Sequence, residues 1–166
     1  MNLSYKNNLG LYIHWPYCES KCPYCDFNSH KTESINEEDW IQAYVNQLHT
    51  MKEMLLKYNV KFNKLNTIFF GGGTPSLMPL KVIEKILNTA NKLFDFEEKI
   101  EITLEANPGS YEREKFLDIN QMGINRLSLG VQSLNDTNLN FLGRKHNYKD
   151  AIIALELAKK TFSNVS

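Results

Sequence analysis

Three cysteines are the residues of this chain whose type and spacing point most directly to chemistry. Cys18, Cys22 and Cys25 are its only cysteines, and they lie in one short stretch of the 166-residue sequence. An odd, tightly grouped set is a poor disulfide framework and is more typical of metal or redox chemistry. Soft thiolates suit iron, and three of them on one loop can converge on an iron–sulfur cluster. A four-iron cluster held in this way keeps one iron open to a substrate or cofactor.

The same segment allows two other interpretations. A zinc site would need a fourth ligand, which His14 or His30 could supply. The run Cys22-Pro23-Tyr24-Cys25 also matches the dithiol motif of glutaredoxins, which follows a strand. Cys18 and the length of the chain do not fit a glutaredoxin.

The overall composition narrows the class of protein. The chain has 19 Lys and Arg against 19 Asp and Glu, so its net charge is zero, which argues against nucleic acid as a partner. A hydrophobic content of 42% excludes a disordered chain. No apolar run approaches the roughly 18 residues of a transmembrane segment, and residues 1–6 show no apolar signal core. We therefore expect a cytoplasmic protein without a transmembrane segment.

The cysteines lie in a loop that other elements must position, and the hydrophobic pattern alternates short strands with helices. Strands are expected over Leu9–Trp15, Leu65–Phe70, Ile100–Ala106 and Asn125–Val131. Helices are expected after a Ser34–Glu37 capping box, over Pro79–Phe94, Tyr111–Gln121 and Asn135–Leu142, and after an Asn147 cap. This βαβα order predicts a parallel sheet with right-handed crossovers.

The strands also predict a polar interior. In the third expected strand, Ile100, Ile102 and Leu104 share one face, while Glu101, Thr103 and Glu105 share the other. We expect the apolar face to meet the helices and the polar face to line a ligand-holding lumen, with Arg126 paired to Glu101 or Glu105. The alternative is an α/β sheet with one solvated face.

The number of strands indicates a partial barrel. A (β/α)₈ barrel uses about 250 residues, or roughly 31 for each unit. This chain accommodates about four βα units, and Ser163–Ser166 read as the entry to a fifth strand that does not form. Residues 1–166 are therefore expected to be the N-terminal part of a core domain, with the remaining barrel strands and a C-terminal domain absent. The fourth strand would then be an unpaired edge.

Several motifs resemble those of one known family. The pattern Cys-x-x-x-Cys-x-aromatic-Cys, with Tyr24 as the aromatic residue, is similar to the signature of radical S-adenosylmethionine (SAM) enzymes. Residues 11–18 and 25–29 resemble the oxygen-independent coproporphyrinogen III oxidase family more closely. Further blocks agree in order and spacing: residues 70–76, 103–109, 125–133 and 142–146. The similarity extends from Tyr12 to the end of the chain.

This resemblance implies a fold, two cofactors and a set of contacts. The fold is a partial (β/α) barrel of radical SAM type, with parallel strands. Cys18, Cys22 and Cys25 would hold a [4Fe-4S] cluster that binds SAM and cleaves it to a 5′-deoxyadenosyl radical. Gly71–Gly73 would present amide groups to SAM, and Glu105 would pair with its ammonium group. The implied SAM contacts are Tyr12, Tyr24, Gly72, Gly73, Thr74, Glu105, Gln132 and Arg144. His14 and His146 are expected to be packed or loop residues.

One position separates two branches of the family. The oxidase carries an additional Cys two positions after the third cluster cysteine, where this chain has Phe27. The resemblance is therefore to the heme chaperone branch, whose members bind heme and pass it to respiratory proteins. The alternatives are an oxygen-independent coproporphyrinogen III oxidase that acts on a porphyrinogen, and a truncated non-catalytic remnant that binds metal or heme.

Overall fold

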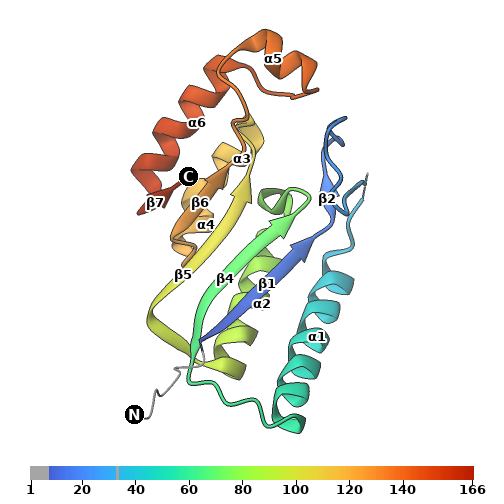
Figure 1. The fold of residues 1–166 in the computed structure, drawn as a ribbon, viewed down its shortest axis with the longest axis vertical. Coiled ribbons are helices and arrows are strands. Elements are labelled where there is room, and N and C mark those ends of the chain that lie inside the picture. Colours follow the sequence, from blue (N-terminus) through green and yellow to red (C-terminus); the bar gives the residue numbers. More distant parts are fainter. Residues whose placement is uncertain (1–7, 33) are drawn as a thin grey trace, which may run out of the picture.

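A five-stranded parallel sheet forms the centre of the structure, a computed structural model that describes residues 8–32 and 34–166 (Figure 1). Residues 1–6, in which the sequence shows no signal core, lie outside the described residues. The strand order is β1-β4-β5-β6-β7, and all neighbours are parallel. The strands are β1 (Leu9–Trp15), β4 (Leu65–Gly72), β5 (Phe96–Ala106), β6 (Arg126–Leu129) and β7 (Asn164–Val165).

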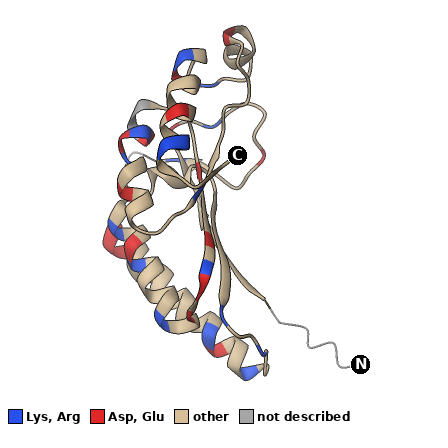
Figure 2. Cartoon of the chain, turned by 90° about the vertical axis from the view of Figure 1, so that its left-hand side faces the viewer, with Lys and Arg blue, Asp and Glu red and all other residues tan. Residues whose placement is uncertain are grey.

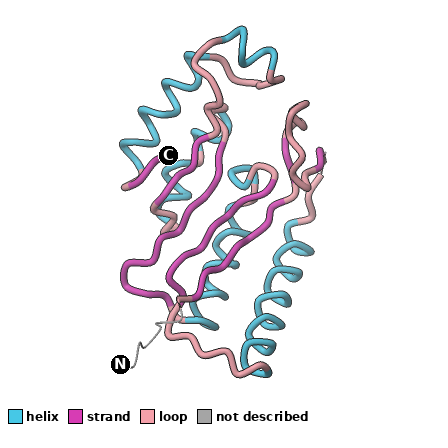
Figure 3. Tube along the Cα trace, viewed as in Figure 1, coloured by secondary structure: helices cyan, strands magenta, loops and turns pink. Residues whose placement is uncertain are grey.

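Helices connect these strands (Figure 3), and the long helices lie along one side of the sheet (Figure 2). They are α1 (Glu37–Lys57), α2 (Leu80–Phe94), α3 (Ser110–Glu114), α4 (Phe116–Gln121), α5 (Asp136–Phe141) and α6 (Tyr148–Thr161), with a 3₁₀ turn η1 (Pro75–Leu77). A second sheet pairs the short strands β2 (Tyr17–Cys18) and β3 (His30–Lys31). Acidic and basic residues are interspersed along the outer helices (Figure 2). No helix within residues 8–32 and 34–166 has the length and apolar character needed to cross a bilayer.

The alternating strands bury one face, as the sequence predicts. Leu11, Ile13 and Trp15 of β1 are buried, whereas Tyr12 between them is 56% exposed. In β5, Ile102 and Leu104 belong to the same hydrophobic core. The apolar residues of α2 recur at helical spacing and cover this face. The polar residues of the strands therefore lie on the side that the helices do not cover.

Two helix predictions need correction. Helix α1 begins with Asn36 as its N-cap, whose side chain accepts hydrogen bonds from the backbone N–H groups of Glu38 and Asp39, so the predicted Ser34–Glu37 capping box is wrong. Asn caps a helix as well as Ser does, and here it stands directly before the first helical turn. The helix expected over Tyr111–Gln121 is divided into α3 and α4 at Lys115.

The fifth strand also differs from the prediction. Its first residues are present as β7, where Asn164 and Val165 pair with Arg126 and Leu127 of β6. The backbone N–H of Leu129 donates to the carbonyl of Ser166 at 2.8 Å. The fourth predicted strand is thus paired, and the expectation that it forms an open edge is wrong.

Arg126 has different partners from those expected. Its guanidinium donates to Thr103 Oγ1 at 3.2 Å and to Ser166 Oγ at 2.9 Å, rather than to Glu101 or Glu105. The β5–β6 register pairs Arg126 with Thr103, so this hydroxyl is the acceptor directly beside it. Thr103 in turn donates to Glu101.

Candidate functional site

The predicted site residues gather where the strands end. A cleft of about 860 Å³ at this edge is lined by the loops that follow β1, β4, β5 and β6. Nine predicted residues line it: Cys18, Cys22, Tyr24, Cys25, Gly73, Thr74, Glu105, Gln132 and Arg144. The other two, Tyr12 and Gly72, line an adjoining recess of about 170 Å³, and Glu105 borders both spaces. Parallel strands bring their carboxyl ends to one edge, which explains why residues so distant in sequence meet here.

The cysteine loop (residues 18–29) is fixed at both ends by backbone pairing. Strand β2 pairs Tyr17 with His30 and Cys18 with Lys31, so the loop leaves and returns at the same place. Within it, Lys21 Nζ donates to the carbonyls of Phe27 and Ser29, both at 3.4 Å. The N–H of Cys25 donates to the carbonyl of Cys22 at 3.0 Å, which forms a turn around Pro23. All three cysteines are free thiols and partly buried.

This donor set fits an iron–sulfur cluster. Among the described residues, no three His, Cys, Asp or Glu side chains are grouped as ligands of a single ion. Each thiolate of a four-iron cluster binds a different iron, so the sulfur atoms need not converge on one point. The ring of His14, one of the two fourth ligands considered for zinc, is already engaged: Nδ1 contacts the Tyr12 hydroxyl at 3.3 Å and Nε2 the Asn28 carbonyl at 3.0 Å.

The glycine loop at the end of β4 (residues 71–73) packs against the start of the cysteine loop. The N–H of Gly73 donates to the Trp15 carbonyl at 2.6 Å, and that of Thr74 donates to the Tyr17 carbonyl at 2.8 Å. A Cβ on Gly73 would lie 2.6 Å from the Tyr17 carbonyl oxygen, so this crossing requires glycine. The amide of Gly72 binds Glu105. The N–H groups of Gly72 and Gly73 thus have acceptors within the protein, and the contact of these two residues with SAM stays a prediction.

Glu105 lies between the cleft and the adjoining recess and lines both of them. Burial raises its pKa, and the hydrogen bond from the Gly72 N–H opposes this shift. The pKa of the neighbouring Tyr12 is also raised, first by burial and then by the negative charge of Glu105. A cationic group in the cleft would stabilise the charged carboxylate and return its pKa towards the ordinary value.

Arg144 connects the ends of β5 and β6 with the cysteine loop. Its Nη1 donates to Cys22 Sγ at 3.6 Å and to the Tyr24 hydroxyl at 3.3 Å. Its Nη2 donates to the Gly130 carbonyl at 2.8 Å and to Asn107 Oδ1. The remaining donor, Nε, is buried and has no partner among the described residues. A buried donor without an acceptor is uncommon in a folded protein, so Nε is a candidate donor to a ligand.

Two residues of the cleft were missed at the sequence level. Asn107 joins the network by donating to Thr74 Oγ1 at 3.2 Å, and its position directly after β5 is the signal that could have identified it. Glu112 is 4% exposed, burial raises its pKa, and its carboxylate folds back to Gly109 at the start of α3. Its place three residues after the cap is typical of a residue that stabilises a helix start.

Two other polar residues complete the cleft. His146 is buried, its Nε2 contacts the Val131 carbonyl at 3.0 Å, and burial lowers its pKa, so it is a packed histidine as expected. Gln132 has a φ of 61° and an exposed side chain at the mouth of the cleft.

The fold and the site together define a class: a partial parallel β/α barrel with a cysteine loop after its first long strand and a glycine loop after the second. The chain belongs to the radical SAM superfamily, whose family model matches residues 12–166.

Relatives refine this assignment. The chain is 49% identical over 152 residues to the heme chaperone HemW of Haemophilus influenzae and 41% identical over 151 residues to that of Escherichia coli. The alignments cover 91% and 90% of this chain but 39% of each relative, so the chain spans about two fifths of their length. The structure is similar to that of E. coli coproporphyrinogen III oxidase (HemN), a radical SAM enzyme, with a TM-score of 0.81 and 23% identity over 95% of this chain and 36% of that chain. This likeness confirms the partial-barrel fold.

Proposed function

We propose that this chain binds a [4Fe-4S] cluster through Cys18, Cys22 and Cys25 and binds SAM in the adjoining cleft. The observation that carries the proposal is the meeting of three free thiols with an acidic and a basic side chain, Glu105 and Arg144, around one cleft. When bound, the cluster supplies the electron that cleaves SAM reductively.

The cleft offers complementary groups to the amino-acid end of SAM. Glu105 would accept hydrogen bonds from the ammonium group, which compensates the cost of holding a partly buried carboxylate. The unpartnered Nε of Arg144 would donate to the carboxylate. Tyr24, Thr74 and Gln132 line the same cleft and would contact the rest of the molecule. In this arrangement the protein orients SAM beside the cysteine loop and shields it from water.

We further propose that the protein is part of a cytoplasmic heme chaperone that passes heme to respiratory proteins. Two heme chaperones are its relatives at 49% and 41% identity. Phe27 supports the same branch, since it occupies the position where the oxidase resemblance requires a cysteine. Its ring is 57% exposed and, together with Tyr12 and Phe69, borders the recess next to Glu105. Aromatic side chains of this kind would pack against one edge of a flat, largely apolar ligand such as heme, which is larger than the recess itself.

The structural likeness to HemN keeps a second function open, an oxygen-independent coproporphyrinogen III oxidase that acts on a porphyrinogen. A protein that spans the full length of the relatives separates the two functions. Heme titration followed by absorbance should show saturable binding for a chaperone, whereas conversion of coproporphyrinogen III in the presence of SAM would identify an oxidase.

Anaerobic reconstitution with iron and sulfide tests cluster binding directly. We expect the absorbance and the reduced-state EPR signal of a [4Fe-4S] cluster, and a change in that EPR signal when SAM is added. Cys18→Ala should lose most of the signal, while Ser20→Ala, in the same loop, should retain it. A chain that forms no cluster, or a cluster that persists in Cys18→Ala, would refute the proposal. If the cluster forms but its EPR signal does not change when SAM is added, the chain is a non-catalytic remnant that binds metal without SAM chemistry.

A further inference from the structure

We propose that Arg144 is a positioning residue for the cluster ligand Cys22 and that it raises the reduction potential of the cluster. This inference deepens the proposed function, because it requires that Cys22 binds the cluster. It goes beyond the expected contact between Arg144 and SAM, since it concerns the thiolate and applies without SAM.

The direct evidence is the contact between Arg144 Nη1 and Cys22 Sγ at 3.6 Å. The same nitrogen reaches the Tyr24 hydroxyl at 3.3 Å, so it holds the loop on both sides of Pro23. The guanidinium is planar and its donors have a fixed geometry. Anchoring Nη2 on the Gly130 carbonyl and on Asn107 therefore also fixes the direction in which Nη1 points.

The backbone beside Arg144 is packed against the cysteine loop independently of this side chain. Gly143 has a φ of +67°, and a Cβ there would lie 2.7 Å from Cδ of Pro23. The N–H of Arg144 donates to the Leu139 carbonyl at 2.9 Å. Two separate contacts, one of backbone and one of side chain, thus join residues 143–144 to Cys22-Pro23-Tyr24.

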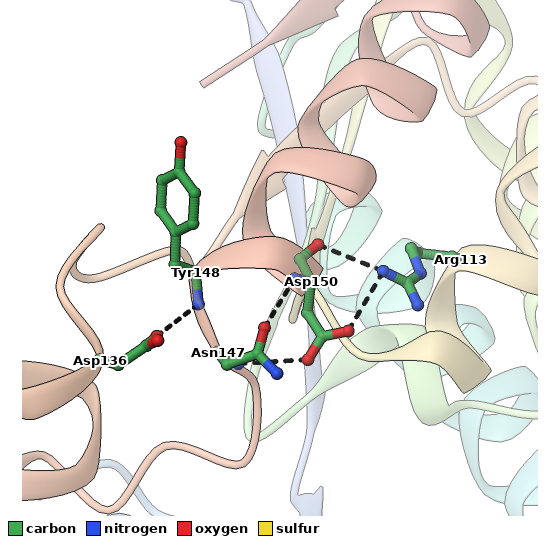
Figure 4. Close-up of polar contacts among 5 residues, drawn as sticks. All are labelled: Arg113, Asp136, Asn147, Tyr148 and Asp150. Carbon is green, nitrogen blue, oxygen red and sulfur yellow. Dashed lines mark hydrogen bonds and ion pairs between the residues drawn. The ribbon is translucent and has the colours of Figure 1, made fainter.

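Helix α6, which follows Arg144, is also fixed by polar contacts with neighbouring elements (Figure 4). Asn147 and Asp150 form a reciprocal capping box at the start of α6. Arg113 of α3 donates to the Asp150 carbonyl at 3.2 Å and pairs with its carboxylate at 3.6 Å. The N–H of Tyr148 donates to Asp136 of α5 at 2.6 Å. These contacts hold the segment carrying Arg144 between α5 and α3, so the guanidinium can act as a rigid support.

Electrostatics gives the direction of the effect. Hydrogen bonds to the ligand sulfur atoms and the net charge of the surroundings are among the factors that set the potential of an iron–sulfur cluster. Reduction adds negative charge, which a cationic donor on Cys22 stabilises more in the reduced than in the oxidised state. Removing this donor should therefore make the cluster harder to reduce. Lysine would keep the charge but would lose the planar arrangement of donors.

The test is a redox titration of the reconstituted chain without SAM, monitored by EPR. We expect Arg144→Gln to reduce the ratio of reduced to oxidised cluster about tenfold at a given potential, which corresponds to about 59 mV for a one-electron couple. Arg144→Lys should give a smaller shift in the same direction. Ser20→Ala changes the cysteine loop but leaves the contacts of Arg144 in place, and it should stay close to the wild-type potential.

The outcomes separate this inference from the proposed function. A wild-type chain without a cluster overturns both. A cluster whose potential and EPR line shape are unchanged in Arg144→Gln overturns only the role of Arg144. If Arg144→Gln does not fold, Asn107→Ala decides, because it removes one anchor of Nη2 and leaves the charge in place. A broadened EPR signal and a lowered potential in that variant support the inference, whereas wild-type behaviour refutes it.

Discussion

The crossing between the glycine loop and the start of the cysteine loop makes a sharp prediction: Gly73→Ala should destabilise the fold and impair cluster binding together. A Cβ at this position would meet the carbonyl oxygen of Tyr17 at 2.6 Å and its carbonyl carbon at 2.9 Å. Both are backbone atoms, which cannot rotate away as a flexible side chain can. The two segments must therefore separate.

The size of the effect follows from the bonds at the crossing. The gap has to open by roughly 0.9 Å to reach an ordinary contact, as dispersion contacts require about 3.5 Å. Such a movement breaks the bonds from Gly73 N–H to Trp15 and from Thr74 N–H to Tyr17. Each contributes about 1 kcal/mol net, and an unpaired buried group costs more, so we expect a loss of about 2–3 kcal/mol. For a domain of this size that lowers the Tm by about 5–10 °C.

Thermal unfolding followed by circular dichroism and an iron and sulfide assay measure both parts of the prediction. Gly10→Ala is the matched control, because its Cβ would approach only the side-chain oxygen of Thr67, at 2.9 Å, which can rotate. We expect this control to stay within about 0.5 kcal/mol of the wild type. If Gly73→Ala unfolds at the same temperature as Gly10→Ala and binds as much iron, the crossing does not hold the two loops as described.

Three further substitutions test other parts of the structure. Glu105→Gln should weaken SAM binding about 10- to 100-fold in calorimetry, the value of about 1.5–3 kcal/mol for a hydrogen bond to a charged group. Because burial raises the pKa of Glu105, wild-type affinity should fall as the pH decreases through that raised pKa, and the Gln variant should lack this step; an equal pH profile would refute the role. The same shift means that protonation of Glu105 favours the folded state, so its contribution to stability should decrease as the pH rises through this range. Asn147→Ala removes the cap of α6 and should cost about 1 kcal/mol, or about 2–4 °C in Tm, measured by thermal unfolding; no change would argue against the capping box. Phe27→Cys should leave stability within about 0.5 kcal/mol and the iron content unchanged, since its ring is largely exposed; loss of the cluster would show that Phe27 supports the loop.

Much of the fold could be predicted because its signals are local. Strand β1 coincides with the expected Leu9–Trp15, and the alternation in β5 identified the buried face. The errors arose where neighbouring candidates compete or where the partner is distant. Asn36 and Ser34 both suit a helix start, and only the path of the chain selects Asn36. The pairing of β7 with β6 depends on a segment that lies almost forty residues further along the chain.

The candidate site was likewise predicted only in part. The resemblance supplied the residues around the cleft, and the structure brings them together, although their roles as ligands stay predictions. Asn107 was overlooked because its partners, Thr74 and Arg144, lie 33 and 37 residues away. Sequence alone also does not show that the amides of Gly72 and Gly73 already donate to Glu105 and Trp15.

By itself, the sequence determined the cysteine loop, the order of strands and helices and the face that each strand buries. These properties depend on residues separated by a few positions, so spacing and periodicity record them. Only the tertiary structure decided that Arg144 contacts Cys22, 122 residues away, and that Gly143 packs on Pro23. Such contacts depend on the register of parallel strands and the path of the loops between them, which no local pattern encodes.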